Sequence, residues 1–452
     1  MRACAQSYLW RSQYDPLLYT HPELYPVKKM VYFPKVTIDR VKLKSLMILI
    51  FPAQQFVIST PLSPVRPYML MVVILGLFLV FSKVARYKRS NVDIAISLVF
   101  IYMLYSALWA DNILLAIQMA GGIIILLLTY FVVRIILSGG SISELKMACV
   151  LASKLFIILS FLYYIAGILL HYVVQVPLTM EEGAKVAYLY GVYFEGGVIP
   201  RLRGFSDSPN NFGMYAVFFL VSLYLQDKIS KTYVISIIIL MILTLSNTTY
   251  LAMILIGIIF CLKKYRVIPL TFGMASILGG LVIYAVNSRL LVNVSTDNAD
   301  IINRISTGSG RWEIFRYGLK SFEERPWFGH GLNQAREILE PLRSVKSTHN
   351  NFIEILLEGG LVGFIVYTFG LVIIITKARS LKSDRKLNLW AVSSLSGFFV
   401  FSNANVTLYA DSTIIMLAVL ASMSASRRFK TDRIVKYINV KPQHNPIIHK
   451  YL

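Results

Sequence analysis

Residues 304–363 read RISTGSGRWEIFRYGLKSFEERPWFGHGLNQAREILEPLRSVKSTHNNFIEILLEGGLVG, the longest polar stretch in an otherwise strongly apolar sequence. The stretch contains two of the six histidines, His330 and His349, together with several arginines and glycines. A long apolar run begins directly after the second histidine. The pattern predicts a large polar connection that leads into a membrane-spanning helix.

The composition outside this stretch is typical of a membrane protein. The chain has 452 residues, of which 56% are hydrophobic and only 15% are charged, which is too apolar for a soluble domain. Apolar runs of roughly 17–25 residues recur along the chain, and an α-helix needs this length to cross about 30 Å of hydrocarbon. We therefore expect an all-α polytopic membrane protein with about twelve transmembrane helices and two long outer, periplasmic loops.

The apolar runs divide the chain into seven segments. We expect a basic cytoplasmic tail over residues 1–44, without a signal peptide and with Met30 and Met47 as alternative starts, and a second basic tail over residues 425–452. Transmembrane helices are expected over residues 45–172, 212–286 and 351–424, with periplasmic loops over residues 173–211 and 287–350. The expected spans are centred near residues 52, 75, 100, 125, 160, 219, 239, 255, 276, 365, 396 and 417.

The positive charge follows the expected topology. The formal net charge is +22, but most Lys and Arg residues fall in short connections between apolar runs, as in cytoplasmic loops. We therefore expect membrane lipids, and no nucleic acid, as partners. The short outer connections near residues 63, 111, 247 and 408 hold almost no basic residues, with Arg66 as the exception. Arginines in the two long loops have no topological reason, so we interpret them as functional, with a solvated loop surface as the alternative.

The first long loop ends in RLRGFSDSPNNFG, residues 201–213. Arg201 and Arg203 precede a turn and the expected start of a helix. Arginine forms bidentate hydrogen bonds with phosphate, and a helix N-terminus also favours an anion. The segment therefore predicts an anion site, and the alternative is a simple loop-to-helix cap.

The second long loop contains Gly308-Ser309-Gly310-Arg311-Trp312, which is too short and irregular for a P-loop. Its glycines still allow backbone N–H groups to approach an anion beside Arg311. The spacing of residues 311, 315, 318 and 322 predicts one helix face, and the sequence PWFGHG at residues 326–331 breaks the helix. Trp312 and Trp327 suit a membrane–water boundary. We expect a helix and a turn on the outer membrane surface.

The next span contains two carboxyl groups in its first turns. Asn350, Glu354 and Glu358 are four residues apart and share one helix face. Such carboxyl groups should face a polar cavity, the bundle interior or a partner, although the helix dipole also favours Glu354. His349 precedes them at the expected membrane boundary, where a neutral imidazole can act as a base.

These blocks resemble a known family. The pattern His349-Asn350, nine residues, Gly360, two residues, Gly363 resembles the signature of the O-antigen ligase family, which comprises O-antigen ligases and related O-antigen polymerases of bacterial envelopes. The block that begins at Gly308 resembles the periplasmic loop of that family. The block around Arg203 resembles its earlier arginine-bearing block. The resemblance covers about residues 195–370.

The resemblance implies a glycosyltransferase of the bacterial inner membrane. Such an enzyme takes a glycan from undecaprenyl diphosphate on the periplasmic face and transfers it to a sugar hydroxyl, on lipid A-core or on a lipid-linked chain. The diphosphate-binding residues of the family correspond to Arg203, with Arg201 as the neighbouring candidate, and Arg311, and its histidine corresponds to His349. The family works without a bound metal or other cofactor. We expect His349 to be the base, with Glu354 as second choice.

Two other classes of protein remain as alternatives. A transporter or flippase of lipid-linked glycans usually has ionisable groups in the middle of the membrane, whereas the arginines and the histidine here gather on one outer face. A non-catalytic membrane scaffold does not need these residues on two separate outer loops. The choice between ligase and polymerase stays open, because both substrates share the diphosphate end.

Overall fold

The computed structural model describes residues 39–56, 65–82, 89–180, 186–195, 200–261, 311–340 and 347–438. These residues belong to one compact unit, Asp39–Leu452. The expected span near residue 276, the turn at residues 308–310, residues 1–38 of the first tail and residues 439–452 of the second tail lie outside the described residues.

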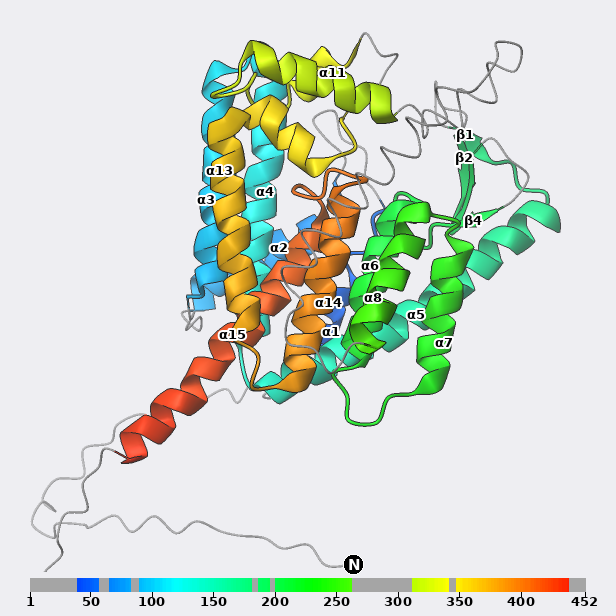
Figure 1. Cartoon of the computed structure of the whole chain (residues 1–452). Helices are drawn as coiled ribbons and strands as arrows, with labels where there is room; N and C mark the ends of the chain where they lie inside the picture. Colours follow the sequence, from blue (N-terminus) through cyan, green and yellow to red (C-terminus); the bar gives the residue numbers. More distant parts are fainter. Residues whose placement is uncertain are drawn as a thin grey trace, which may run out of the picture. The chain divides into compact units, whose positions relative to one another are not determined.

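The described part of the chain is mainly helical (Figure 1). Ten of the twelve expected span centres fall inside helices, and the centre near residue 52 lies just after α1. The helices are α1 (Arg40–Leu49), α2 (Pro67–Ser82), α3 (Asn91–Ser106), α4 (Ile113–Ser138), α5 (Ile142–Tyr172), α6 (Pro209–Leu223), α7 (Lys231–Leu243), α8 (Asn247–Cys261), α11 (Arg311–Glu324), α12 (Ala335–Ile338), α13 (Asn351–Arg379), α14 (Arg385–Ser402) and α15 (Asp411–Ile438).

Four helices are long and apolar enough to cross a membrane, among the residues that the structure describes. They are Asn91–Trp109, Ile113–Ser138, Ile142–Tyr172 and Asn351–Arg379, and shorter apolar helices lie at Pro67–Leu77, Lys231–Leu243, Asn247–Phe260 and Asp411–Ala425. Large apolar side chains on α3, α4, α5 and α13 are exposed, as lipid-facing surfaces require. The chain is thus a multi-pass membrane protein, and the number of twelve spans stays a prediction.

The fold is mainly helical, as the sequence predicts, but the first long connection departs locally from the all-α expectation. This connection contains a small antiparallel sheet in the order β1-β2-β3-β4, formed by Thr179–Met180, Val186–Leu189, Val192–Glu195 and Arg201–Leu202. The β2–β3 hairpin turns at Tyr190 and Gly191, and Tyr190 has a φ of 48°. The hairpin packs on α5, because Gly191 lies so close to the Tyr163 backbone that a Cβ would come within 2.9 Å of it. Short strands of this kind carry little periodic signal in a sequence.

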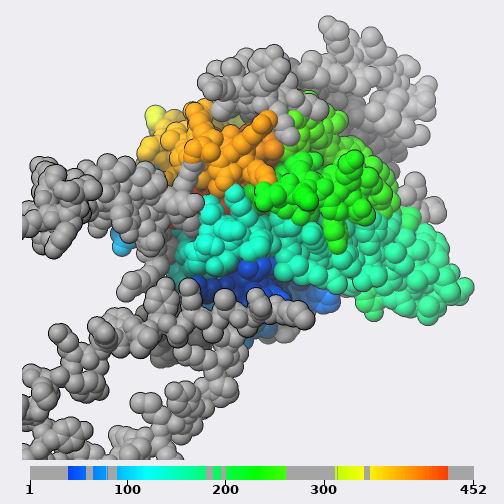
Figure 2. Space-filling model, turned by 90° about the horizontal axis from the view of Figure 1, so that it is seen from below, coloured from blue at the N-terminus to red at the C-terminus, as the bar shows by residue number. Residues whose placement is uncertain are grey.

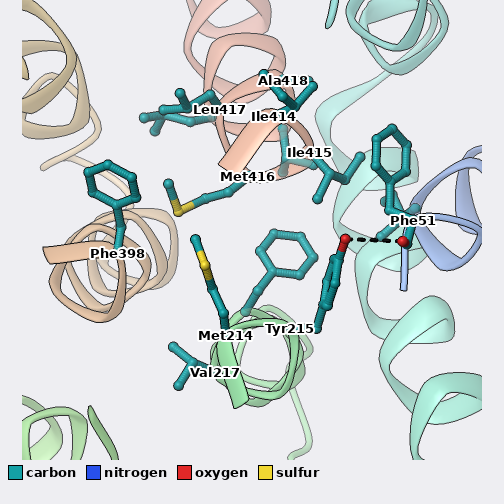
Figure 3. Close-up of a cluster of buried hydrophobic side chains, with 14 of the residues drawn as sticks. Phe51, Met214, Tyr215, Val217, Phe398, Ile414, Ile415, Met416, Leu417 and Ala418 are labelled. Carbon is teal, nitrogen blue, oxygen red and sulfur yellow. Dashed lines mark hydrogen bonds between the residues drawn. The ribbon is translucent and has the colours of Figure 1, made fainter. Parts of the chain in front are cut away.

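The helices pack around one apolar core. Figure 3 shows its centre, where α6, α14 and α15 bring together Met214, Phe398, Met416 and their neighbours. The Tyr215 hydroxyl donates to the carbonyl of Phe51 at 3.0 Å, which connects the core of α6 to the end of α1. On the face seen in Figure 2, α5 runs between α1 and α7.

Contacts between connections fall into two sets that match the two expected sides of the membrane. One set joins the connections predicted to be outside, through Arg66–Asp207, Arg66–Asp411, Arg325–Asp111, Arg201–Thr244 and Asn351–Leu408. The other set joins connections predicted to be inside, through Lys44–Glu144, Lys146–Asp384, Lys386–Asp227 and Ser90–Ser424. The side of the membrane on which each set lies stays a prediction.

Candidate active site

Helix α13 is bent into two limbs at Gly360, which has φ 63° and ψ −164°. The Asn351 side-chain amide donates to the Tyr367 hydroxyl at 2.7 Å, although 16 residues separate them. In a straight helix this separation would span roughly 24 Å. The short limb, residues 351–359, is therefore folded back toward the long limb, residues 361–379, as Figure 1 shows beneath α11. The sequence-based interpretation of one continuous helix is wrong here.

The turn at residues 326–331 fills the break. His330 N–H donates to the Leu357 carbonyl and Gly331 N–H to the Glu358 carbonyl, both at 2.9 Å. In the other direction, the carbonyls of residues 326 and 327 accept from the N–H groups of residues 361 and 362. The backbone groups that the bend would leave unpaired thus gain partners, as helix ends require.

Two glycines are explained by this bend, and a third is explained by the contact of the long limb with α3. A Cβ on Gly360 would lie 2.4 Å from the Trp327 carbonyl oxygen, in a backbone region that only glycine adopts readily. A Cβ on Gly329 would lie 2.6 Å from the Glu358 carbonyl carbon, and one on Gly363 would lie 2.7 Å from the Tyr102 ring. Gly360 and Gly363 of the histidine pattern therefore have structural reasons to be glycines.

His349 and Arg311 come from different parts of the second connection, and the Arg311 guanidinium lies close enough to act on the His349 imidazole. Both side chains are half-buried. Helix α11 lies against the start of the short limb, because Gly318 faces Ile353 and Thr348. Gly318 belongs to the face predicted from the spacing of residues 311, 315, 318 and 322, but the other buried residues of the helix are Ile314 and Ser321. Burial, and secondly the Arg311 guanidinium, lowers the pKa of His349 below its usual value. The imidazole is therefore neutral near pH 7, which a general base requires.

His349 has an unusual backbone. Its φ of 52° lies in the left-handed region, which non-glycine residues seldom adopt. The neighbouring residues hold it there: Asn350 caps the short limb by accepting from the N–H groups of Phe352 and Ile353. Strained residues of this kind cluster at functional sites.

The two carboxyl groups are buried, as predicted for the bundle interior. Glu354 is 6% and Glu358 is 2% exposed. The Glu354 carboxylate accepts from the Thr348 N–H at 2.7 Å and so fixes the residue that precedes His349. This contact gives Glu354 a structural role that competes with its predicted role as second-choice base.

The side chain of His330, the other histidine of the connection, is buried and contacts other parts of the protein. It is 5% exposed, and its Nε2 lies 2.9 Å from the Ser321 carbonyl oxygen. Its Nδ1 lies 3.9 Å from Asp111, which also pairs with Arg325 at 2.9 Å. The two histidines therefore differ, because only His349 combines partial exposure with a neighbouring arginine of the candidate site.

Arg201 lies on β4, and Arg203 directly follows this strand. Arg203 is 6% exposed, its Nε donates to the Tyr190 carbonyl at 2.9 Å, and its guanidinium lies 4.1 Å from the Tyr188 ring centre. Arg201 is half-buried and donates to the Thr244 carbonyl at 3.0 Å. Arg203 thus holds the hairpin together, and Arg201 is the more accessible of the two.

A charged network at the same end of the bundle was missed from the sequence. Arg66 pairs with Asp411 and, at 2.7 Å, with Asp207. Asp411 is 1% exposed and also accepts from Tyr68 and Gln54. The network joins the starts of α2, α6 and α15. The signal in the sequence was Arg66 itself, the one basic residue in the short outer connections.

In the part of the chain that the structure describes, no group of three or more His, Cys, Asp and Glu side chains is arranged to hold a metal ion. The family model described as O-antigen ligase matches residues 232–368. This match includes Arg311, His349 and the bend, and it supports the O-antigen ligase and polymerase family. No curated protein matches the chain.

Proposed function

We propose that the chain is a glycosyltransferase of the bacterial inner membrane that transfers a glycan from undecaprenyl diphosphate to a sugar hydroxyl on the periplasmic face. The family match indicates a role in membrane glycan ligation or polymerisation. The donor, the acceptor and the side of the membrane are part of the proposal. The acceptor is lipid A-core for a ligase and a lipid-linked chain for a polymerase.

The pairing of His349 with Arg311 carries this proposal. A glycan transfer from a diphosphate needs a base for the acceptor hydroxyl and a cation for the leaving group. His349 is half-buried with a lowered pKa, and Arg311 is its neighbour from another helix. Positioned cations in a water-poor site stabilise developing charge strongly, so arginines can serve a diphosphate here.

The simplest chemistry is one displacement with inversion. The acceptor oxygen bonds to the anomeric carbon, the bond from that carbon to the diphosphate oxygen breaks, and the hydroxyl proton passes to a ring nitrogen of His349. Arg311 stabilises the charge that develops on the departing diphosphate. Glu354 stays the second candidate for the base, although its bond to the Thr348 N–H favours a structural role.

Arg201 and Arg203 complete the proposed diphosphate site. The burial of Arg203 under Tyr188 favours a role in shaping the hairpin, and the greater exposure of Arg201 favours direct phosphate contact. Arg201→Ala should then raise KM for the lipid-linked donor. Arg203→Ala should also lower the thermal stability of the protein.

The experiment is a gel of envelope glycans from a deletion strain complemented with wild type, His349→Ala or Arg311→Ala. Loss of a base typically costs about 10²–10⁴ in rate, and loss of one charge-stabilising donor about 10²–10³. Single repeat units on lipid A-core that only wild type extends indicate a polymerase. Bare core with accumulated lipid-linked long chains indicates a ligase. An unchanged glycan pattern contradicts O-antigen as the substrate.

The alternative function is a multi-span transporter or flippase of lipid-linked glycans. It predicts that lipid-linked glycan accumulates on the cytoplasmic side in the deletion strain. It also predicts that purified wild-type protein transfers no glycan when donor and acceptor are both supplied on the outer side.

A further inference from the structure

Glu358 is a buried carboxyl group that the proposed reaction does not use. It is 2% exposed and lies at the end of the short limb of α13, directly before the bend. Burying a carboxyl group is costly unless it gains hydrogen bonds, so its partners indicate its role. Those partners come from two other parts of the chain.

The first partner segment is the end of the long polar connection. The backbone N–H groups of Asn333 and Ala335 lie close enough to the Glu358 carboxyl group to stabilise a negative charge on it. Gln334, between them, is fixed to the start of α4: its Oε1 accepts from the Asn112 N–H at 2.8 Å. The Glu358 carboxyl group therefore faces a segment that is itself anchored on the α3–α4 turn.

The second partner is the connection between α14 and α15. The Tyr409 hydroxyl donates to Glu358 Oε2 at 3.5 Å, a long contact. At the other end of the limb, Asn351 Oδ1 accepts from the Leu408 N–H at 2.8 Å. The two ends of the short limb are thus connected to two consecutive residues, one end to Leu408 and the other to Tyr409.

The short limb in turn carries the candidate site. His349 lies two residues before the limb, and Leu357 packs with Ile314 of α11 and with Leu339 in a small apolar cluster. Ile314 lies one helical turn from Arg311. The position of the limb therefore sets the position of His349 relative to Arg311.

We infer that Glu358 is a positioning residue of the proposed glycan transfer: its carboxyl group holds the short limb of α13 in place and thereby keeps His349 beside Arg311. This inference rests on the proposed function. Misplacement of a reacting group by about 1 Å can lower the rate about 10²-fold. Glu358→Ala should therefore lower kcat by about that factor, with KM for the lipid-linked donor changed less than about threefold.

Glu358→Gln distinguishes positioning from proton transfer. The amide oxygen of glutamine still faces the N–H groups of Asn333 and Ala335, so this variant should keep kcat within about threefold of wild type. Tyr409→Phe removes only the long contact and should have a similarly small effect. A Gln variant as inactive as the Ala variant would overturn the inference, because a charge or a proton would then be needed.

The assay uses the full-length protein in vesicles, with undecaprenyl diphosphate-linked glycan as donor and purified lipid A-core or lipid-linked chain as acceptor. Hydrogen–deuterium exchange of the same samples reports the limb independently of activity. Glu358→Ala should speed exchange over residues 347–359 and 329–335 and leave α7 unchanged. Wild-type kcat or unchanged exchange in this variant would overturn the inference.

The two measurements separate this inference from the proposed function. If wild type transfers no glycan to either acceptor, the proposed function fails, and the role of Glu358 in transfer fails with it. If wild type is active and His349→Ala is not, the function stands. Unchanged kcat in Glu358→Ala then contradicts the positioning role alone.

Discussion

At the scale of single residues, the electrostatics of the candidate site follow from one half-buried histidine beside one arginine. A free histidine has a pKa of about 6.5. Burial and then Arg311 lower the pKa of His349, since both disfavour the imidazolium. The folded protein therefore binds this proton less readily than the unfolded chain. The histidine thus lowers the stability of the folded state as the pH falls below about 6.5.

This arrangement predicts a pH dependence. If neutral His349 is the base, kcat/KM falls on the acid side with a midpoint below about 6.5. Arg311→Gln removes one of the two causes of the lowered His349 pKa. The midpoint of the kcat/KM profile should therefore move to higher pH, and the rate should also fall. Arg316→Gln is the matched control, because Arg316 is an exposed arginine of the same helix. An unchanged midpoint in Arg311→Gln would contradict the pairing.

The ion pair of Arg66 and Asp411 gives a second prediction at this scale. Asp411 is 1% exposed, so removing its partner leaves a buried carboxylate without its cation. Such losses typically cost about 3–5 kcal/mol. Arg66→Met should therefore lower the thermal unfolding temperature in detergent more than Arg66→Lys does. Asp411→Asn in the Arg66→Met background should recover part of the loss, and a further decrease would argue against the pairing.

Residues that stand out from their neighbours in the sequence could be identified, whereas residues defined by a contact distant in the sequence could not. His349 and Arg311 stand out because they lie in the longest polar stretch of an otherwise apolar chain. Asp411 does not stand out, because an acidic residue at the start of a helix is common. Its partner Arg66 is 345 residues away, and no local pattern records a contact at that separation.

At the scale of elements, helix α11 was predictable and the bend of α13 was not. The apolar and polar periodicity of residues 311–324 is local, and it predicted the helix and the place of Gly318 on the face that meets Thr348 and Ile353. The bend depends on hydrogen bonds from residues 326–331, which reach the site only in the folded chain. The glycine pair at residues 359–360 and the turn at residues 326–331 were the signals, but neither shows that the two segments meet.

The bend predicts a marked difference between two glycine substitutions. Gly360→Ala should cost of order 1–3 kcal/mol for the backbone conformation, and more for the contact with the Trp327 carbonyl. Gly122→Ala is the control, because a Cβ there meets nothing within 4 Å and α4 is helical around it. Alanine in such a helix position should add about 0.5–1 kcal/mol. Thermal unfolding in detergent measures the effect of both substitutions. Equal unfolding temperatures of Gly360→Ala and Gly122→Ala would contradict the bend.

At the scale of the whole molecule, apolar periodicity predicted most helices, and the alternation of basic connections predicted which connections meet. Ten expected centres lie in helices, and the contacts among connections form the two predicted sets. The β-sheet was missed because its strands have two to four residues, too short for a periodic signal. The distribution of Lys and Arg among the connections depends on the side of the membrane, so it carries information about contacts between residues far apart in the sequence.

The same alternation makes a prediction about sidedness that is independent of catalysis. Arg336 on α12 and Lys382 between α13 and α14 are both exposed, and they belong to opposite sets of connections. The native cysteines are Cys4, Cys149 and Cys261, so replacing them with serine gives a background for single labels. A membrane-impermeant maleimide should label Arg336→Cys in intact spheroplasts and Lys382→Cys only in inverted vesicles. Labelling of both from the same side would contradict the predicted topology, because residues 336 and 382 would then not be separated by the membrane.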